Sequence, residues 1–150
     1  GHARRGGLLL SEAEGAVVNA DLLDGPQGTI TPEFRQNLEF GRDASSSRLV
    51  DAISRISAAG AACARAMVDV DTLIMPTAPQ RAFPHGSDVP NNQADFSGLA
   101  NFAKRPAVSI PVPLSGEILP AAVQLLGHPG EDPALLAIAD VLDRELETTS

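Results

Sequence analysis

The chain has 150 residues, of which 43% are hydrophobic, so it can form one domain with a substantial core but is too short for two ordinary domains. Its formal net charge of -8 and its lack of Trp and Tyr exclude the cationic surfaces and stacking platforms with which proteins bind nucleic acids. A single cysteine, Cys63, excludes an internal disulfide framework, and no apolar run approaches the roughly 18 residues needed to span a bilayer.

The first two residues bear on where the domain begins. Gly1 and His2 resemble the scar that a protease leaves when a purification tag is removed. We set these two residues aside and expect residues 3–150 to form a single domain. One cysteine fits a reducing compartment, so we expect a cytoplasmic protein without a membrane partner.

Helix signals dominate the first part of the chain. Residues 11–14 have the capping-box form, which predicts a helix over about 11–23. Thr31 and Pro32 supply an N-cap and a first-turn proline for a second helix, which we expect to end at Gly41.

A longer helix is expected from Ser45 to about Asp69. Its apolar positions alternate steps of four and three, which is the spacing of one helical seam, and they are Leu49, Ile53, Ile56, Gly60, Cys63 and Met67. Glycine costs roughly 1 kcal/mol against alanine inside a helix. Gly60 therefore predicts the close approach of a neighbouring backbone.

Strand signals follow in the second half. Short apolar runs predict strands at about 72–76, 107–112 and 121–127. A proline-rich loop occupies 76–92, a short helix is expected over 93–103, a hairpin-sized turn lies at 114–118, and a last helix begins at Asp132. The last two strands are apolar on both faces, which is typical of interior strands. The order of elements predicts an α/β fold, with a few mixed strands covered by helices.

Three ordered motifs resemble the amidase signature family. Residues 69–79, Asp-Val-Asp-Thr-Leu-Ile-Met-Pro-Thr-Ala-Pro, are similar to its Asp-Val-Leu-Leu-Thr-Pro-Thr strand and loop. Residues 100–111 are similar to its Asn-Leu-Ala-Gly-Leu-Pro-Ala-Val-Ser-Val-Pro segment, and residues 119–127 resemble its closing strand. The chain therefore resembles the C-terminal half of an amidase.

The resemblance implies a serine hydrolase that cleaves amides without a cofactor or metal. In the family, a Ser, cis-Ser, Lys relay uses a buried neutral lysine to activate the nucleophile. That relay lies upstream of the matching region, and nothing like it occurs between Gly1 and Ser150. Residues 45–47, three serines, lack flanking glycines and precede a helix, which favours capping. We therefore assign no catalytic residue and expect the chain alone to be inactive.

The resemblance also implies that this half supplies one wall of the substrate pocket. The candidate residues are Thr77, Pro79, Asp95 and Asn101. For Asp95, the first turn of a helix is the better interpretation, because the helix dipole favours a carboxylate there. Asn101 equally suits hydrogen bonding to the local backbone. Residues 84–86 of the proline-rich loop are a further candidate, although His85 is better interpreted as a surface histidine.

The chain departs from the family pattern at three positions where glycine is usual, which are Lys104, Ile118 and Ala122. Side chains there restrict the backbone conformations that glycine allows. Lys104, the only lysine, is expected on a surface turn. Gln124 alternates with apolar residues and, if buried, requires a hydrogen-bond partner.

Two hypotheses follow. The first is that the chain is the C-terminal portion of an amidase-family hydrolase, whose partner is an N-terminal catalytic half in the same or a separate chain. The second is a non-catalytic, amidase-derived structural or interaction domain that self-associates as a homo-oligomer, because exposed strand edges and apolar helix faces favour association.

Overall fold

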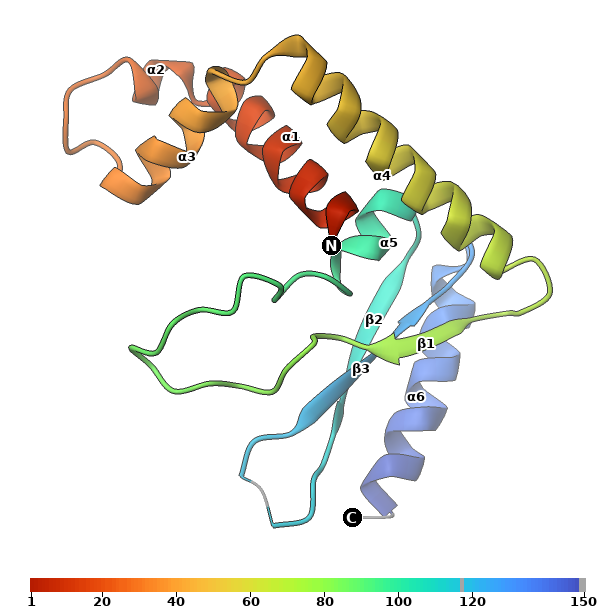
Figure 1. Cartoon of the computed structure of the whole chain (residues 1–150). Helices are drawn as coiled ribbons and strands as arrows, with labels where there is room; N and C mark the ends of the chain where they lie inside the picture. Colours follow the sequence, from red (N-terminus) through yellow and green to blue (C-terminus); the bar gives the residue numbers. More distant parts are fainter. Residues whose placement is uncertain (117, 149–150) are drawn as a thin grey trace. The chain divides into compact units, whose positions relative to one another are not determined.

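The computed structural model describes residues 1–116 and 118–148 (Figure 1). The chain divides into two compact units, Gly1–Ala58 and Ala59–Ser150, and helix α4 (Ser46–Ala66) runs across their boundary. The first unit contains helices and loops, and the second contains a three-stranded sheet with helices. The fold is α/β, as the sequence predicts. Among the described residues, no helix is both long and apolar enough to cross a membrane.

The first unit begins with helices α1 (His2–Val18) and α2 (Ala20–Leu23). The predicted start at Ser11 is wrong, because the preceding Arg and Leu residues favour helix and Leu9 is buried. The predicted continuous helix is also interrupted at Asn19. Its side-chain amide donates to the Gly15 carbonyl oxygen at 2.8 Å and so competes with the backbone bonds of the helix.

Helix α3 (Pro32–Arg42) crosses α1 at close range. We expected α3 to end at Gly41, but the helix continues to Arg42 and Gly41 lies at this crossing. A Cβ atom at Gly41 would lie 2.2 Å from the carbonyl carbon of Glu12, so no side chain fits there. The core of this unit consists of Ala16, Leu23 and Leu38, with Ile30 packed against them.

Both predicted N-caps are confirmed. The Thr31 Oγ1 atom accepts a hydrogen bond from the Phe34 backbone N–H at 3.2 Å, with Pro32 in the first turn of α3. The Ser45 Oγ atom accepts from the Arg48 backbone N–H at 3.4 Å, ahead of α4. Ser45 therefore serves the helix end, as its sequence context predicts.

The buried side of α4 differs from the predicted seam at one position. Ile53 is 49% exposed, whereas the preceding Ala52 is 2% exposed. A Cβ atom at Gly6 of α1 would lie 3.1 Å from the Ala52 carbonyl oxygen, so this close helix contact accommodates alanine rather than isoleucine. The prediction for Gly60 is confirmed in the second unit, where a Cβ atom would lie 2.7 Å from the Phe102 carbonyl oxygen.

The sheet of the second unit has the order β1-β3-β2. Its strands are β1 (Leu73–Pro76), β2 (Ala107–Val112) and β3 (Ala121–Leu126), within a residue of the predicted ranges. Both pairings are antiparallel, so the mixed strand directions that we expected do not occur among the described residues. Position 117, in the predicted hairpin turn, lies outside the described residues.

Helices cover the two faces of the sheet unequally. On one face, Leu126 packs with Cys63, Met67 and Ala100 from α4, the segment after it and α5 (Gly98–Ala103). On the other face, Leu125 and Ile110 pack against Leu135 and Ala139 of α6 (Asp132–Thr148). The predicted cover on both faces holds for β3, whereas alternate residues of β2 are exposed.

The segment between β1 and α5 is a long loop. Helix α5 begins at Gly98 rather than near residue 93, because residues 91–97 form turns instead. Residues 81–89 are all exposed, and His85 is among them. The loop therefore carries Pro79 and Asp95 near its two ends.

Candidate functional site

A pair of hydroxyl groups lies where β1 leads into the long loop. The Thr77 backbone N–H donates to the Ala122 carbonyl oxygen at 3.0 Å, which extends the β1–β3 pairing by one residue. The Thr77 Oγ1 and Ser109 Oγ atoms are 2.7 Å apart. One hydroxyl donates to the other, so the pair retains one hydroxyl hydrogen that can bind a further acceptor. Ser109 is exposed, which leaves this donor accessible.

The two arms of the loop are joined close to the other candidates. The Gln80 side-chain amide donates to the Gln93 side-chain carbonyl oxygen, and these residues lie close in sequence to Pro79 and Asp95 respectively. This hydrogen bond holds the two arms of the loop together, so the Thr77–Pro79 segment and the Asp95 segment both lie at the base of the loop. Asp95 precedes α5 and lies in a turn, where its backbone N–H donates to the Asn92 carbonyl oxygen at 2.9 Å.

Asn101 is the candidate residue that lies on α5. Its side chain is exposed and makes no hydrogen bond within the part of the chain that the structure describes. Its backbone carbonyl accepts a hydrogen bond from the Lys104 N–H at 3.2 Å. The local-backbone role that we considered for the Asn101 side chain is therefore absent among the described residues, and the side chain is available to a ligand.

Lys104 ends α5 in the left-handed conformation, with φ 52° and ψ 49°. The Arg105 N–H donates to the Ala100 carbonyl oxygen at 3.0 Å, which completes a Schellman-type helix end. Lys104 is exposed on this turn, as predicted. The usual glycine of the family would adopt this conformation without steric cost.

Sequence reasoning missed a contact that joins three segments of the second unit. Arg105 Nη1 donates to the Gly127 carbonyl oxygen at 3.2 Å and lies 3.4 Å from His128 Nδ1. His128 Nε2 lies 2.8 Å from the Val70 carbonyl oxygen. A carbonyl oxygen can only accept, so Nε2 carries the proton and Nδ1 is free to accept from Arg105. The partners are too distant in sequence for any motif to reveal this contact.

Gln124 is buried, with 4% of its surface exposed. Its Nε2 atom has no hydrogen-bond partner among the described residues. The register places Gln124 opposite Met75 on one side and opposite Ser109 on the other. The sequence analysis expected a hydrogen-bond partner for a buried Gln124, and none is found for Nε2 among the described residues.

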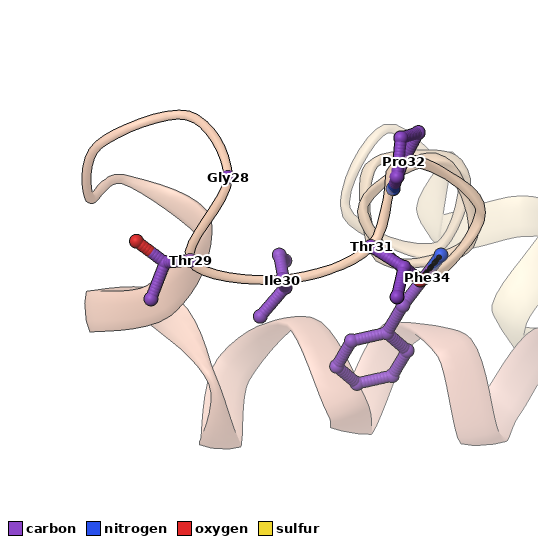
Figure 2. Close-up of a pocket in the computed structure, with 6 residues that line it drawn as sticks. All are labelled: Gly28, Thr29, Ile30, Thr31, Pro32 and Phe34. Atoms are coloured by element: carbon purple, nitrogen blue, oxygen red, sulfur yellow. Dashed lines mark hydrogen bonds between the residues drawn. The ribbon is translucent and has the colours of Figure 1, made fainter.

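A hollow of about 660 Å³ lies in the first unit, along the segment that leads into α3 (Figure 2). It is lined by Gly28, Thr29, Ile30, Thr31, Pro32 and Phe34. Figure 2 shows the Phe34 ring pointing away from Pro32. The Thr31 hydroxyl already accepts the capping hydrogen bond of α3, so the lining of the hollow is mainly apolar and does not suggest a catalytic group. None of the predicted pocket residues lines it.

Comparisons with known proteins agree on one family. The family model described as Amidase matches residues 12–136. The chain is 34% identical over 90 residues to the glutamyl-tRNA(Gln) amidotransferase A subunit of Synechococcus sp. (strain CC9311), which covers 57% of this chain and 18% of that protein. It is 38% identical over 86 residues to the protein of the same name from Parvibaculum lavamentivorans, covering 54% of this chain and 18% of that protein.

Solved structures show the same fold. The chain is similar to a crystal structure of an amidase with a TM-score of 0.83 and 22% identity. The match covers 96% of this chain and 35% of that chain. The chain therefore spans about a third of that structure and 18% of each of the two curated relatives.

Proposed function

This chain belongs to the amidase family, and from that premise we propose that it is the C-terminal portion of a larger hydrolase that cleaves a carboxamide C–N bond. Residues 3–150 supply part of the sheet and one wall of the substrate pocket. The nucleophile comes from an N-terminal part, in the same or a separate chain. We also propose a cytoplasmic location and a tag scar at Gly1 and His2.

One observation carries this proposal. The family model extends over residues 12–136, nearly the whole chain, yet the chain spans 18% of its curated relatives. A segment that matches a family throughout but amounts to a fraction of its members' length is best explained as a part of such a protein. The serines at 45–47 support the absence of a nucleophile, because Ser45 caps α4.

The proposed wall carries groups that suit a carboxamide. The Thr77–Ser109 pair offers a hydroxyl hydrogen that can bind the carbonyl oxygen of an amide. The Asp95 carboxylate can accept an amide N–H, and the exposed Asn101 side chain can both donate and accept. Pro79 shapes the loop between them by fixing its own φ angle.

The test begins with the native coding region immediately upstream of Ala3. We expect an in-frame segment with a lysine and a glycine-flanked serine pair. The longer product should release ammonia or an amine from simple carboxamides. A start codon at or near Ala3, with no separately encoded catalytic half, would contradict the proposal.

Variants in the longer product test the wall. The double variant Thr77→Ala/Ser109→Ala and the single variants Asp95→Ala and Asn101→Ala should each raise KM for a carboxamide substrate, because each removes the side-chain groups that hydrogen-bond to the substrate. His85→Ala is the matched control, since His85 is an exposed residue of the same loop. Equal kinetics for all four variants would remove these residues from the pocket.

A second candidate function is a non-catalytic, self-associating domain. It is favoured by large apolar side chains that the chain leaves exposed, such as Val17 at 78% and Val18 at 82% on α1. Sedimentation equilibrium separates the two candidates. A stable oligomer of the isolated chain, with no catalytic half encoded in the same genome, would support the second.

A further inference from the structure

Gln124 is a buried polar residue in the middle of β3. Its Nε2 atom is shielded from solvent, yet it has no hydrogen-bond partner among the described residues. Burial removes the hydrogen bonds that an amide nitrogen makes with water, and this loss costs free energy unless a protein or ligand acceptor replaces them. An apolar side chain of the same shape would avoid that cost. Stability of the chain therefore does not account for a glutamine at this position.

The strand register places Gln124 beside the hydroxyl pair of Thr77 and Ser109. Ser109 lies opposite Gln124 on β2. The Gly127 N–H donates to the Pro106 carbonyl oxygen at 3.0 Å, and hydrogen-bonded pairs alternate from there, so Ser109 and Gln124 form a non-hydrogen-bonded pair. The Cα atoms of such a pair are about 4.5 Å apart, which brings their side chains closer than in hydrogen-bonded pairs. A rotation of the Gln124 amide can therefore reach Ser109 Oγ.

The other neighbours of Gln124 on this face of the sheet offer no comparable acceptor. Met75, which is opposite Gln124 on β1, has a thioether sulfur, and this is a weak acceptor. Along β3 the same face carries Ala122 and Leu126, because alternate residues of a strand share a face. Both of these side chains are apolar. Among these neighbours, the Ser109 hydroxyl is thus the acceptor suited to Nε2.

The hydroxyl pair itself can be directed in two ways. Thr77 Oγ1 and Ser109 Oγ are 2.7 Å apart, and either can donate to the other. A hydroxyl group donates one hydrogen bond and can accept two. When Ser109 Oγ accepts from Gln124, its own donation to Thr77 becomes stronger, because hydrogen bonds in a chain polarise one another. This direction leaves the hydroxyl hydrogen of Thr77 free, at the base of the loop that carries Pro79.

We infer that Gln124 is a positioning residue for the proposed amide hydrolysis. When a carboxamide binds, Gln124 Nε2 donates to Ser109 Oγ and the Ser109 hydroxyl donates to Thr77 Oγ1. The Thr77 hydroxyl then donates to the carbonyl oxygen of the substrate. The substrate provides the terminal acceptor of this chain, so the buried amide gains its hydrogen bond in the complex. This role rests on the proposed function, and Gln124 performs it without touching the substrate.

A double-mutant cycle in the longer product tests this role. Gln124→Met removes both polar atoms with little change in side-chain volume, and Ser109→Ala removes the hydroxyl that relays the effect. Leu125→Met is the matched control, because Leu125 is the next buried residue of β3 and packs on the opposite face, against α6. KM and kcat are measured for the best hydrolysed of acetamide, propionamide and benzamide. Urea unfolding midpoints are measured for every variant.

We expect Gln124→Met and Ser109→Ala each to raise KM about five- to tenfold and to change kcat by less than about twofold. The reason is that a hydrogen bond to the carbonyl oxygen in both the ground and transition states contributes to binding alone. The double variant should match either single variant, because both remove the same relay. Leu125→Met should keep the parent KM. The unfolding midpoint of Gln124→Met should equal or exceed the parent value, since Nε2 loses no bond within the described residues.

An unchanged KM for Gln124→Met would overturn this role, although the proposed function would stand. KM effects that multiply in the double variant would also overturn it, because Gln124 would then act independently of Ser109. A lower unfolding midpoint for Gln124→Met would replace the positioning role with a structural one, in which the rest of the protein supplies the acceptor. If none of the three carboxamides is hydrolysed, the proposed function falls and this role falls with it.

Discussion

At the scale of single residues, Lys104 has a conformation that L-amino acids rarely adopt. Its φ of 52° lies in the left-handed region, which costs a non-glycine residue roughly 1–2 kcal/mol. Lys104→Gly should therefore raise the free energy of unfolding by about 0.5–1 kcal/mol, after the greater chain entropy of glycine is counted. Urea denaturation measures the change.

Lys104→Ala is the control for this prediction. Alanine removes the charge and the long side chain but keeps the Cβ atom that is responsible for the steric cost. It should leave stability nearly unchanged. An equal gain from alanine and glycine would show that the lysine side chain, rather than the backbone, carries the cost.

Glu12 on α1 is a partly buried carboxyl whose Oε2 atom has no hydrogen-bond partner among the described residues. Burial raises the pKa of Glu12 above its ordinary value of 4.5, and the nearby Arg48 guanidinium opposes this shift to a smaller extent. The folded chain thus binds this proton more tightly than the unfolded chain. Its stability decreases as the pH rises from 4.5 through the raised pKa.

Glu12→Gln should remove this pH-dependent loss. The variant's advantage in the free energy of unfolding should be smallest below pH 4.5, where the carboxyl is protonated in both the folded and the unfolded chain, and should grow towards neutral pH. Denaturation curves between about pH 4 and pH 7 measure it, with the exposed Glu14→Gln as control. An advantage that stays constant with pH would contradict the role of burial.

At the scale of elements, the contact between α4 and α5 depends on Gly60. Alanine would gain about 1 kcal/mol in helix propensity. However, its Cβ atom would lie 2.7 Å from the Phe102 carbonyl oxygen, and relieving such overpacking costs about 1–3 kcal/mol. We expect Gly60→Ala to destabilise the chain by about 1 kcal/mol in net terms, as measured by thermal or urea unfolding.

Ala62→Gly, at an exposed position of α4, calibrates the propensity difference in the same helix. It should cost about 1 kcal/mol without any change in packing. If Gly60→Ala stabilises the chain by the same amount, the close backbone approach has no energetic weight.

The strands were predictable because prolines and polar turns bound short apolar runs, as at Pro106 and Pro120. The ends of the helices were less predictable than the strands. The capping-box pattern at residues 11–14 lies inside α1, where tertiary packing of Leu9 outweighs the local signal. Periodicity alone places Ile53 on the buried side of α4. The close contact with α1 instead buries the smaller Ala52 and leaves Ile53 exposed.

The candidate site was predictable only in part. The position of Thr77 follows from the strand that precedes it, but its hydroxyl partner Ser109 lies 32 residues away. The Arg105–His128 contact spans 23 residues, and helical or strand periodicity carries no information over such distances. Side-chain partners between elements depend on strand register, which is set by packing across the whole sheet rather than by the pattern of any one strand.

At the scale of the whole molecule, the proposed function places the nucleophile and its base in the N-terminal part of the enzyme, outside residues 3–150. We expect the isolated 150-residue chain to show no hydrolysis of simple carboxamides above the uncatalysed rate, as measured by ammonia release. If the chain does hydrolyse carboxamides and this activity disappears in Ser45→Ala, Ser46→Ala or Ser47→Ala, the serines at the start of α4 have a catalytic role instead.

The His128–Val70 contact also bears on the order in which the second unit assembles. Its two residues are 58 positions apart, so this contact closes one of the longest loops of the unit. Closing a long loop costs chain entropy before any contact compensates for it, and high contact order slows folding. The neighbouring β2–β3 hairpin is far more local in sequence. The His128 ring resonance should therefore report the last stage of refolding, when β1 joins a hairpin that has already formed.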